Sequence, residues 1–168
     1  RNMRAEIRDT RSDMKKMLQI NYPNSLGAFY SSITEYLGFK QDEDEGKLMG
    51  LAPYGDDSLN QKMKQVLVMK DGLYRLNLDY FDFYKDPTKN VSLKFIEVFG
   101  KPRKKNDQLT KRHKDIARAT QAALEDAMVN LAQYTYEITG EENLCLAGGV
   151  ALNSVGNGKI LKKNIFKD

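Results

Sequence analysis

The feature that most constrains this fold is a stretch of 28 residues, 112–139, whose apolar side chains recur at helical spacing. The side chains on the expected apolar face are Ile116, Ala123, Leu124, Ala127, Leu131, Tyr134 and Ile138. At about 1.5 Å per residue the helix would be about 42 Å long, enough to cross a domain. Gly140 follows as its stop signal. The remaining elements are therefore expected to pack along this one helix.

The first forty residues predict three short elements. Apolar spacing over residues 1–18 (Met3, Ile7, Met14, Met17 and Leu18) favours a helix, and alternation over residues 18–22 favours a short strand. Ser25 is positioned to cap a helix over residues 26–37, and Gly38 is positioned to end it.

Further elements are predicted between residues 41 and 111. Helical patterns occupy residues 46–52, 59–67 and 91–99. Asp71-Gly72 between two apolar runs predicts a hairpin over residues 67–76, because Asp-Gly suits a tight two-residue turn. The expected fold class is α/β, or α+β by content: helix-rich, with a small sheet.

The segment 144–163 predicts a buried strand over residues 144–147, a tight turn at Gly148-Gly149, and a helix from residue 150 to 163. Glycine has no Cβ, so a ligand can approach the main chain, and a helix start presents free N–H groups to an anion. This arrangement is typical of nucleotide sites. A plain strand-to-helix connection explains the residues equally well.

A second informative segment is DEDEGKLMGLAPYGD, residues 42–56. The Glu45 carboxylate can accept ribose hydroxyls, and the Lys47 ammonium can meet a phosphate. On residue chemistry alone, an amphipathic helix with an acidic start and a Pro-Gly exit explains the segment better.

The positive charge is local. The chain carries a net charge of +4, but residues 101–114 alone hold seven Lys or Arg against one Asp. The high pI is therefore no indication of a nucleic-acid-binding protein. Because this segment lacks aromatic residues for base stacking, a solvated loop is favoured over an anion, partner or RNA site. His113, at the start of the following helix, is expected to be solvated.

Several classes of site are excluded by residue counts. One cysteine and one histidine allow no disulfide within the chain and no Cys/His metal cluster. Cys145 lies in an apolar run and is expected to be an inert core residue in a cytoplasmic protein. No apolar stretch is long enough to span a membrane, and no P-loop or dinucleotide fingerprint is present.

Five segments, in this order and approximate spacing, resemble the nodulation and antibiotic-biosynthesis O-carbamoyltransferases. They are PNSLGAFYS at 23–31, EGKLMGLAPYGD at 45–56, RLNLDYF at 75–81, LAGGVALN at 146–153, and Asn157-Gly158-Lys159. The resemblance covers nearly the whole chain from about residue 18.

The resemblance implies a fold and an activity. Residues 1–168 would be a single partial domain, the second half of the family's larger, N-terminal domain, which has the actin- and hexokinase-like ATPase fold. The adenylate-forming domain, which makes carbamoyl-adenylate from carbamoyl phosphate and ATP, would be absent. The larger domain would pass the carbamoyl group to a hydroxyl of a sugar or natural product.

The resemblance also implies site residues. Gly148, Gly149 and Asn153 would contact the nucleotide, and Glu45 and Lys47 would line the same cleft from a facing helix. A divalent, iron-like metal would be held by an H-x-x-x-H motif and an aspartate outside this chain. No catalytic residue or metal ligand is assigned within it. The isolated chain is therefore expected to be inactive.

Two further departures and two alternatives remain. Ser154 and Gly156 stand where the family often has Cys and Ala. A sugar-kinase-like ATPase of the same fold, or a non-catalytic binding module using residues 101–114, stays open. Small molecules are the expected partners, with no nucleic acid or membrane, and acceptor and oligomeric state are left undetermined.

Overall fold

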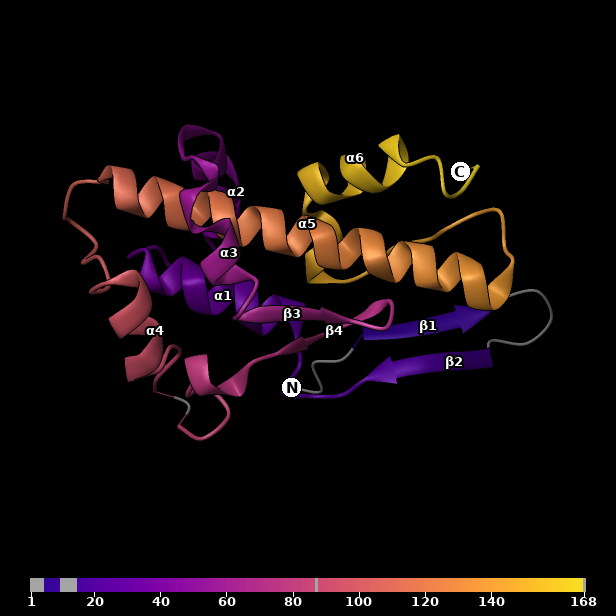
Figure 1. Ribbon diagram of the computed structural model, residues 1–168, viewed down its shortest axis with the longest axis horizontal. Coiled ribbons are helices and arrows are strands. Elements are labelled where there is room, and N and C mark those ends of the chain that lie inside the picture. The colour runs from indigo at the N-terminus through magenta and orange to yellow at the C-terminus, as the bar shows by residue number, and fades with distance from the viewer. Residues whose placement is uncertain (1–4, 10–14, 87, 168) are drawn as a thin grey trace.

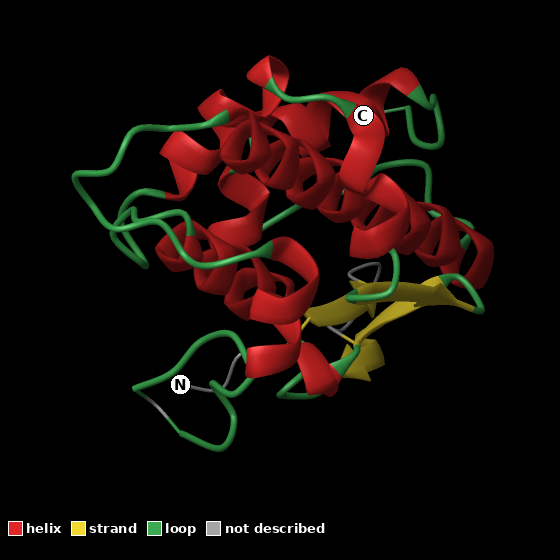
Figure 2. Ribbon diagram, turned by 60° about the vertical axis from the view of Figure 1, so that its left-hand side comes forward, coloured by secondary structure: helices red, strands yellow, loops and turns green. Residues whose placement is uncertain are grey.

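The computed structural model describes residues 5–9, 15–86 and 88–167. Helices dominate, with two small antiparallel hairpins (Figure 2). The long helix α5, Lys111–Thr139, runs through the length of the molecule, with α6 on one side and the hairpins on the other in this view (Figure 1). Its predicted extent and its stop at Gly140, with a φ of 64°, are confirmed. The α+β content is confirmed as well.

The N-terminal prediction of a helix is wrong. Strands β1 (Ala5–Asp9) and β2 (Lys15–Ile20) form an antiparallel hairpin in which Ile7 pairs with Leu18. Met3 and Met14, which entered the helical pattern, lie outside the described residues. Few apolar side chains support a helix here, whereas pairing across the hairpin satisfies backbone groups of both segments. The short strand expected at residues 18–22 is confirmed in part.

Helix α1 (Leu26–Tyr36) forms as its caps predict. The Ser25 hydroxyl accepts a hydrogen bond from the Ala28 N–H at 3.1 Å. Gly38, with a φ of 75°, ends the helix, and its N–H donates to the Glu35 carbonyl at 2.7 Å. Nine of its side chains are buried, so α1 is a core helix rather than a surface helix.

The next segment packs on the first turns of α5. It contains α2 (Glu45–Leu51), α3 (Asn60–Met63) and two 3-10 turns, η1 (Ala52–Tyr54) and η2 (Asp57–Leu59). Helix α3 is shorter than predicted because the chain leaves the helix at residues 64–66 to enter the next strand. The Asp56 N–H donates to the Asp115 carboxylate at 3.0 Å, which fastens this segment to α5.

The second hairpin is as predicted. Strands β3 (Leu67–Lys70) and β4 (Leu73–Leu76) pair across a turn at Asp71 and Gly72, whose φ angles are 52° and 76°. A short turn, η3 (Leu78–Tyr80), and α4 (Leu93–Phe99) follow. Phe95 of α4 centres an aromatic cluster, stacking on Phe99 at 4.4 Å and meeting other rings edge-on or tilted. These other rings are Tyr36, Tyr80 and Phe81.

The basic segment 101–114 is not simply a solvated loop. Arg103 is buried, and its guanidinium donates to the Leu37 carbonyl at 2.7 Å and to three carbonyls of its own loop. Arg112 donates to the carbonyls of Phe99 and Lys101. A guanidinium presents several donors in a fixed fork, so one arginine can hold several carbonyls together.

His113 was expected to be exposed, and the structure corrects this. The residue is buried, and its Nδ1 atom accepts a hydrogen bond from the Thr110 N–H at 3.0 Å. Thr110 and His113 thus form a reciprocal capping pair at the start of α5. Glutamate or glutamine usually returns the bond to the N-cap, so a histidine at that position is not a recognised sequence signal of a cap.

The expected strand at 144–147 is also wrong. The segment has no regular secondary structure and belongs to no sheet among the described residues, and Cys145 is exposed rather than buried. A strand requires a neighbour for its N–H and C=O groups. Both described sheets are two-stranded hairpins formed elsewhere, so this apolar run has no partner among the described residues. No described helix combines the length and apolar character needed to cross a membrane.

Replacing Gly55 with alanine tests the contact between η1 and α5. A Cβ on Gly55 would lie 2.1 Å from the Lys114 carbonyl oxygen, so the two backbones would have to separate. Gly55→Ala is expected to lower the free energy of unfolding by about 3 kcal/mol or more in urea titrations. Gly50→Ala, with open space around it in α2, is the control and should be neutral or stabilising. Equal changes in unfolding free energy for Gly55→Ala and Gly50→Ala would contradict the close packing of Gly55 on α5.

The pH dependence of stability tests the His113 cap. Burial first, then the charges of Arg112 and Arg103, hold the pKa of His113 below its ordinary 6.5. The folded protein therefore binds this proton less readily than the unfolded chain, so stability is full above pH 6.5 and falls as the pH drops through that value. The loss is expected to be about 1 kcal/mol, the usual contribution of a cap.

His113→Gln is the matched variant, because glutamine can accept the same bond without titrating. Since the chain has one histidine, the slope between pH 8 and pH 5.5 should largely vanish in this variant. An unchanged slope in urea titrations would show that another group is responsible.

Candidate functional site

Helix α1 forms the floor between the two segments that carry the expected site residues. On one side, the Val150 methyl of η4 (Gly149–Leu152) lies 3.9 Å from the position of a Cβ on Gly27. On the other, the Ser31 hydroxyl donates to the Glu45 carboxylate at 2.7 Å. Gly27 and Ser31 are four residues apart on one helix, so these contacts are about 6 Å apart along its axis.

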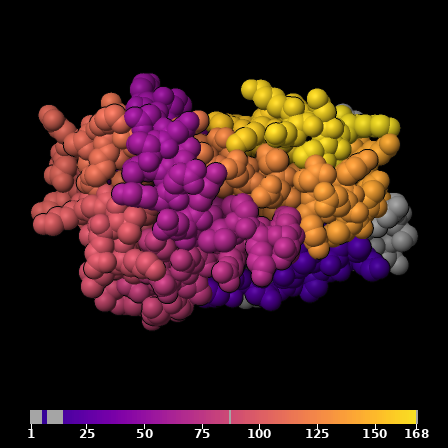
Figure 3. Space-filling view, in the orientation of Figure 1, coloured from indigo at the N-terminus to yellow at the C-terminus, as the bar shows by residue number. Residues whose placement is uncertain are grey.

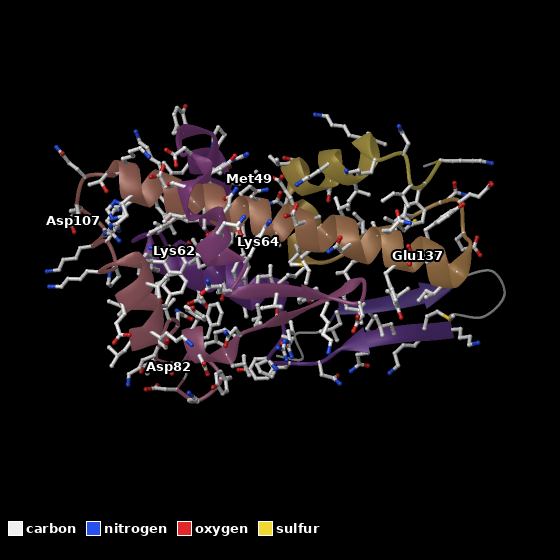
Figure 4. All side chains as sticks on the ribbon, in the orientation of Figure 1. Met49, Lys62, Lys64, Asp82, Asp107 and Glu137 are labelled. Carbon is white, nitrogen blue, oxygen red and sulfur yellow. The ribbon has the colours of Figure 1, made fainter. Side chains whose placement is uncertain are left out.

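A second contact closes the arrangement. The Ser154 hydroxyl, at the first residue of α6 (Ser154–Lys162), donates to the Met49 sulfur of α2 at 3.9 Å. Met49 is labelled in Figure 4, where it lies between α2 and α6. The start of α6, the turn before it and the Glu45 side of α2 therefore surround one region of α1.

The paired glycines are open to approach. Gly148 has a φ of 100°, a conformation that favours glycine, and both residues are exposed. No atom lies within 4 Å of the position of a Cβ on either glycine. The turn is therefore not buried under its own neighbours, and a flat ligand can lie against its main chain.

Asn153 has a buried structural position. Its Oδ1 atom accepts hydrogen bonds from the Gly156 N–H at 2.9 Å and from Gln121 Nε2 at 3.0 Å, and its Nδ2 atom donates to Gln121 Oε1 at 3.0 Å. It thus caps α6 and ties that helix to α5. These bonds commit most of the amide, so its expected contact with a nucleotide stays a prediction.

Tyr30 extends this network into α1. Its hydroxyl donates to Gln121 Oε1 at 2.7 Å, and both side chains are buried. Burial raises the pKa of Tyr30 above its ordinary value, with smaller contributions from the Glu125 and Glu45 carboxylates, so the phenol keeps its proton and remains a donor. Adjacent α1 residues, Tyr30 and Ser31, therefore support the two sides of the site.

The two charged residues expected at the site differ in placement. Glu45 is half-buried, and its Oε1 atom accepts bonds from Ser31 and from the Asp42 N–H, which leaves Oε2 without a hydrogen bond among the described residues. Lys47 is exposed and forms an ion pair with Asp44 at 2.8 Å. Residues two apart on a helix do not face each other. Lys47 would therefore have to leave this surface pair to reach a ligand beside Glu45.

A hollow of about 470 Å³ adjoins the start of α6. It is lined by Glu125 of α5 and by α6 residues that include Ser154, Gly158 and Lys159. Lys159 pairs with Glu125 at 3.3 Å and with Asp126 at 2.9 Å. Among the described residues no group of three or more His, Cys, Asp or Glu side chains is arranged to hold a metal. Metal ligands outside this chain stay a prediction.

Three residues of this region were missed by the sequence analysis: Tyr30, Ser31 and Gln121. One signal was available. Gln121 is a polar side chain on an apolar helix face, between Ala117 and Leu124. A buried polar side chain needs partners, so such positions indicate hydrogen-bond networks, although the sequence does not name the partner.

Comparison with known proteins gives a consistent result. The family model described as the carbamoyltransferase N-terminus matches residues 6–168. An uncharacterized protein of Synechocystis is 44% identical over 153 residues, which is 89% of this chain and 25% of that protein. Nodulation protein NolNO of Sinorhizobium fredii is 37% identical over 159 residues, covering 94% of this chain and 22% of its own length.

Nodulation protein NolO of Bradyrhizobium diazoefficiens is 38% identical over 153 residues, 89% of this chain and 26% of that protein. The chain thus spans about a quarter of the length of these curated relatives.

The stability of an Asn153→Ala variant tests the network below the turn. The change removes the cap of α6 and the two hydrogen bonds between Asn153 and the buried Gln121 amide, which should cost about 2–4 kcal/mol in the free energy of unfolding. Asn157→Ala is the control, because it removes one bond to the Ala151 carbonyl and should cost about 1 kcal/mol or less. If chemical denaturation showed similar losses of unfolding free energy for Asn153→Ala and Asn157→Ala, the central position of Asn153 in this network would be contradicted.

Proposed function

This chain belongs to the carbamoyltransferase N-terminal family, and on that premise we propose that it forms one side of the nucleotide cleft of an O-carbamoyltransferase. The proposed enzyme transfers a carbamoyl group to a hydroxyl of a sugar or natural product. The carbamoyl donor is carbamoyl-adenylate, made from carbamoyl phosphate and ATP. The domain containing this chain is proposed to have the actin- and hexokinase-like ATPase fold.

One observation carries the proposal: the Gly148-Gly149 turn is open, and the region around it is walled by α2 and α6. The main chain there can lie directly against an adenylate, because no side chain intervenes. The adjoining α6 start adds the favourable end of a helix dipole for an anionic group. The openness of this turn therefore supports the proposal that the adenylate binds there.

The residues of this chain are assigned binding roles. Gly148 and Gly149 present main chain to the adenylate, and Asn153 holds α6 and the turn in position. The Glu45 Oε2 atom accepts no hydrogen bond from the described residues and can accept ribose hydroxyls. The adenylate, when bound, supplies an activated carbamoyl group with a good leaving group. None of these residues is assigned a bond-breaking step.

The remaining parts of the reaction are proposed for the longer protein. A divalent, iron-like metal and an adenylate-forming domain would be contributed by segments outside residues 1–168, so we expect no carbamoyl transfer by this chain alone. Two nodulation proteins among its relatives match it over about a quarter of their lengths, and their names specify no acceptor. The single cysteine is compatible with work in a reducing cytoplasm.

Two alternatives expected from the sequence have less support. The hypothesis of a binding module built on residues 101–114 has less support, because several of its basic side chains already have partners. Arg103 and Arg112 donate to backbone carbonyls, and Lys111 pairs with Asp115. A sugar-kinase-like ATPase would share nucleotide binding at this turn. No described contact favours phosphoryl over carbamoyl transfer.

Calorimetric titration of the chain with ATP tests the proposed cleft. Gly149→Val places a side chain where the ligand would approach, and should weaken ATP binding about tenfold or more, equivalent to about 1.4 kcal/mol. The fold should be unaffected, because no atom lies within 4 Å of the added Cβ. Thermal unfolding of the variant checks that point.

Gly50→Val is the matched control, since Gly50 also has open space around it and lies outside the turn. It should leave the affinity unchanged. Equal ATP affinity of Gly149→Val and the wild type, or no ATP binding by the wild-type chain, would contradict the proposal.

A further inference from the structure

The Glu45 carboxylate, at the first residue of α2, is held through one of its two oxygens. Its Oε1 atom accepts a hydrogen bond from the Ser31 hydroxyl at 2.7 Å and another from the Asp42 N–H at 2.8 Å. The Oε2 atom accepts no hydrogen bond from the described residues. Because the two donors come from α1 and from the loop before α2, they fix the orientation of the carboxylate from two sides.

The Ser31 hydroxyl is committed to Glu45. A hydroxyl has one proton to donate, and two carboxylates lie near this one. The Glu45 Oε1 atom is 2.7 Å away, a normal length for a bond from a hydroxyl, whereas the Asp42 Oδ1 atom is 3.4 Å away, beyond the usual range. Ser31 is buried on a core helix, so its hydroxyl is a donor with a fixed position.

The held carboxylate lies on the side of α1 that supports the Gly148-Gly149 turn. Burial raises the pKa of Tyr30, and the Glu45 charge is among those that raise it further, which requires the two side chains to be close. The Tyr30 hydroxyl in turn donates to Gln121, which holds Asn153. Helix α2, in purple, and helix α6, in yellow, lie along the same edge of the molecule in Figure 3.

Holding one oxygen matters because a glutamate side chain is flexible. The last torsion of glutamate has broad preferences, and ordering such a side chain during binding costs affinity. With Oε1 fixed, Oε2 has one orientation before a ligand arrives. A carboxylate accepts hydrogen bonds and donates none, so Oε2 favours a ligand that offers hydroxyls. Acidic side chains recognise the ribose hydroxyls of dinucleotides in this way.

We propose that Ser31 is a positioning residue that makes this site selective for ribonucleotides. By holding Glu45 Oε1, it presents Oε2 to the ribose 2′- and 3′-hydroxyls, and it does not touch the ligand itself. This inference rests on the proposed nucleotide cleft and adds a selectivity to it. If the bond between Ser31 and Glu45 only fastened α2 to α1, its loss would lower stability and leave selectivity unchanged.

Calorimetric titration of the full chain with ATP, 2′-deoxy-ATP and 3′-deoxy-ATP tests this role. The wild type should bind ATP about tenfold more tightly than at least one of the deoxynucleotides, because a missing hydroxyl leaves a charged acceptor without its donor. In Ser31→Ala the carboxylate is free to turn, so this preference should fall to about threefold or less, mainly through weaker ATP binding. Alanine suits a helix interior, and thermal unfolding checks that the variant folds.

A double-mutant cycle shows whether Ser31 acts through Glu45. Glu45→Gln removes the charge and should lower the preference for ATP to a similar level. Adding Ser31→Ala to Glu45→Gln should then lower it no further. Two matched controls should keep the wild-type preference. Ser25→Ala removes a hydroxyl that accepts a bond at the start of the same helix, and Glu43→Gln makes the same charge change two residues before Glu45.

Four results would overturn the inference. Equal affinity of the wild type for ATP and both deoxynucleotides would mean that Oε2 does not bind ribose, while ATP binding at the glycine turn would stand. An undiminished preference in Ser31→Ala would mean a bond with a purely structural role. An equal loss of preference in Ser25→Ala would mean that general destabilisation of α1 lowers it. Absence of any ATP binding by the wild type would contradict the proposed cleft as well.

Discussion

The close packing of short segments against one long helix is the constraint on which the rest of this structure depends. Helix α5 is contacted by α1, α2, α3, α6 and the β3–β4 hairpin, and none of these is long enough to bury its apolar side alone. Two glycines show how close the approach is. A Cβ on Gly55 would meet the α5 backbone, and one on Gly156 would lie 2.5 Å from the Met128 sulfur.

Polar side chains in this packed interior determine where the site residues lie. Tyr30 of α1, Gln121 of α5 and Asn153, the cap of α6, form hydrogen bonds with one another, so the three helices have one favourable relative arrangement. An unsatisfied buried amide would cost more than the bond contributes, which makes the network specific rather than merely stabilising. The open glycine turn is supported by this arrangement, because Asn153 caps the helix that follows it.

The basic residues divide into two groups by their chemistry. Arg103 and Arg112 each bind several carbonyls and hold the 101–114 segment to the core. Lys64 and Lys163 are compact charges on flexible side chains, and neither forms an ion pair with another described residue. Counting charge along the sequence does not separate these two groups, since a guanidinium fork is suited to internal carbonyls and a lysine is readily left at the surface.

The sequence by itself determined the features whose causes lie within a few residues. The α5 periodicity, the Ser25 cap, the Gly38 and Gly140 stops and the Asp71-Gly72 turn all depend on neighbouring atoms, and all are present as predicted. The family resemblance could also be recognised from the sequence, because it rests on five short segments that occur in a fixed order. Only the tertiary structure decided the features that need a partner far along the chain.

Several features depend on a partner far along the chain. They are the N-terminal hairpin, the lack of a strand partner for 144–147 among the described residues, the exposure of Cys145, and the burial of Arg103 and His113. A strand exists only beside another strand, and a buried polar group only beside the donors or acceptors that satisfy it. Those partners are brought together by folding, so no local pattern specifies them.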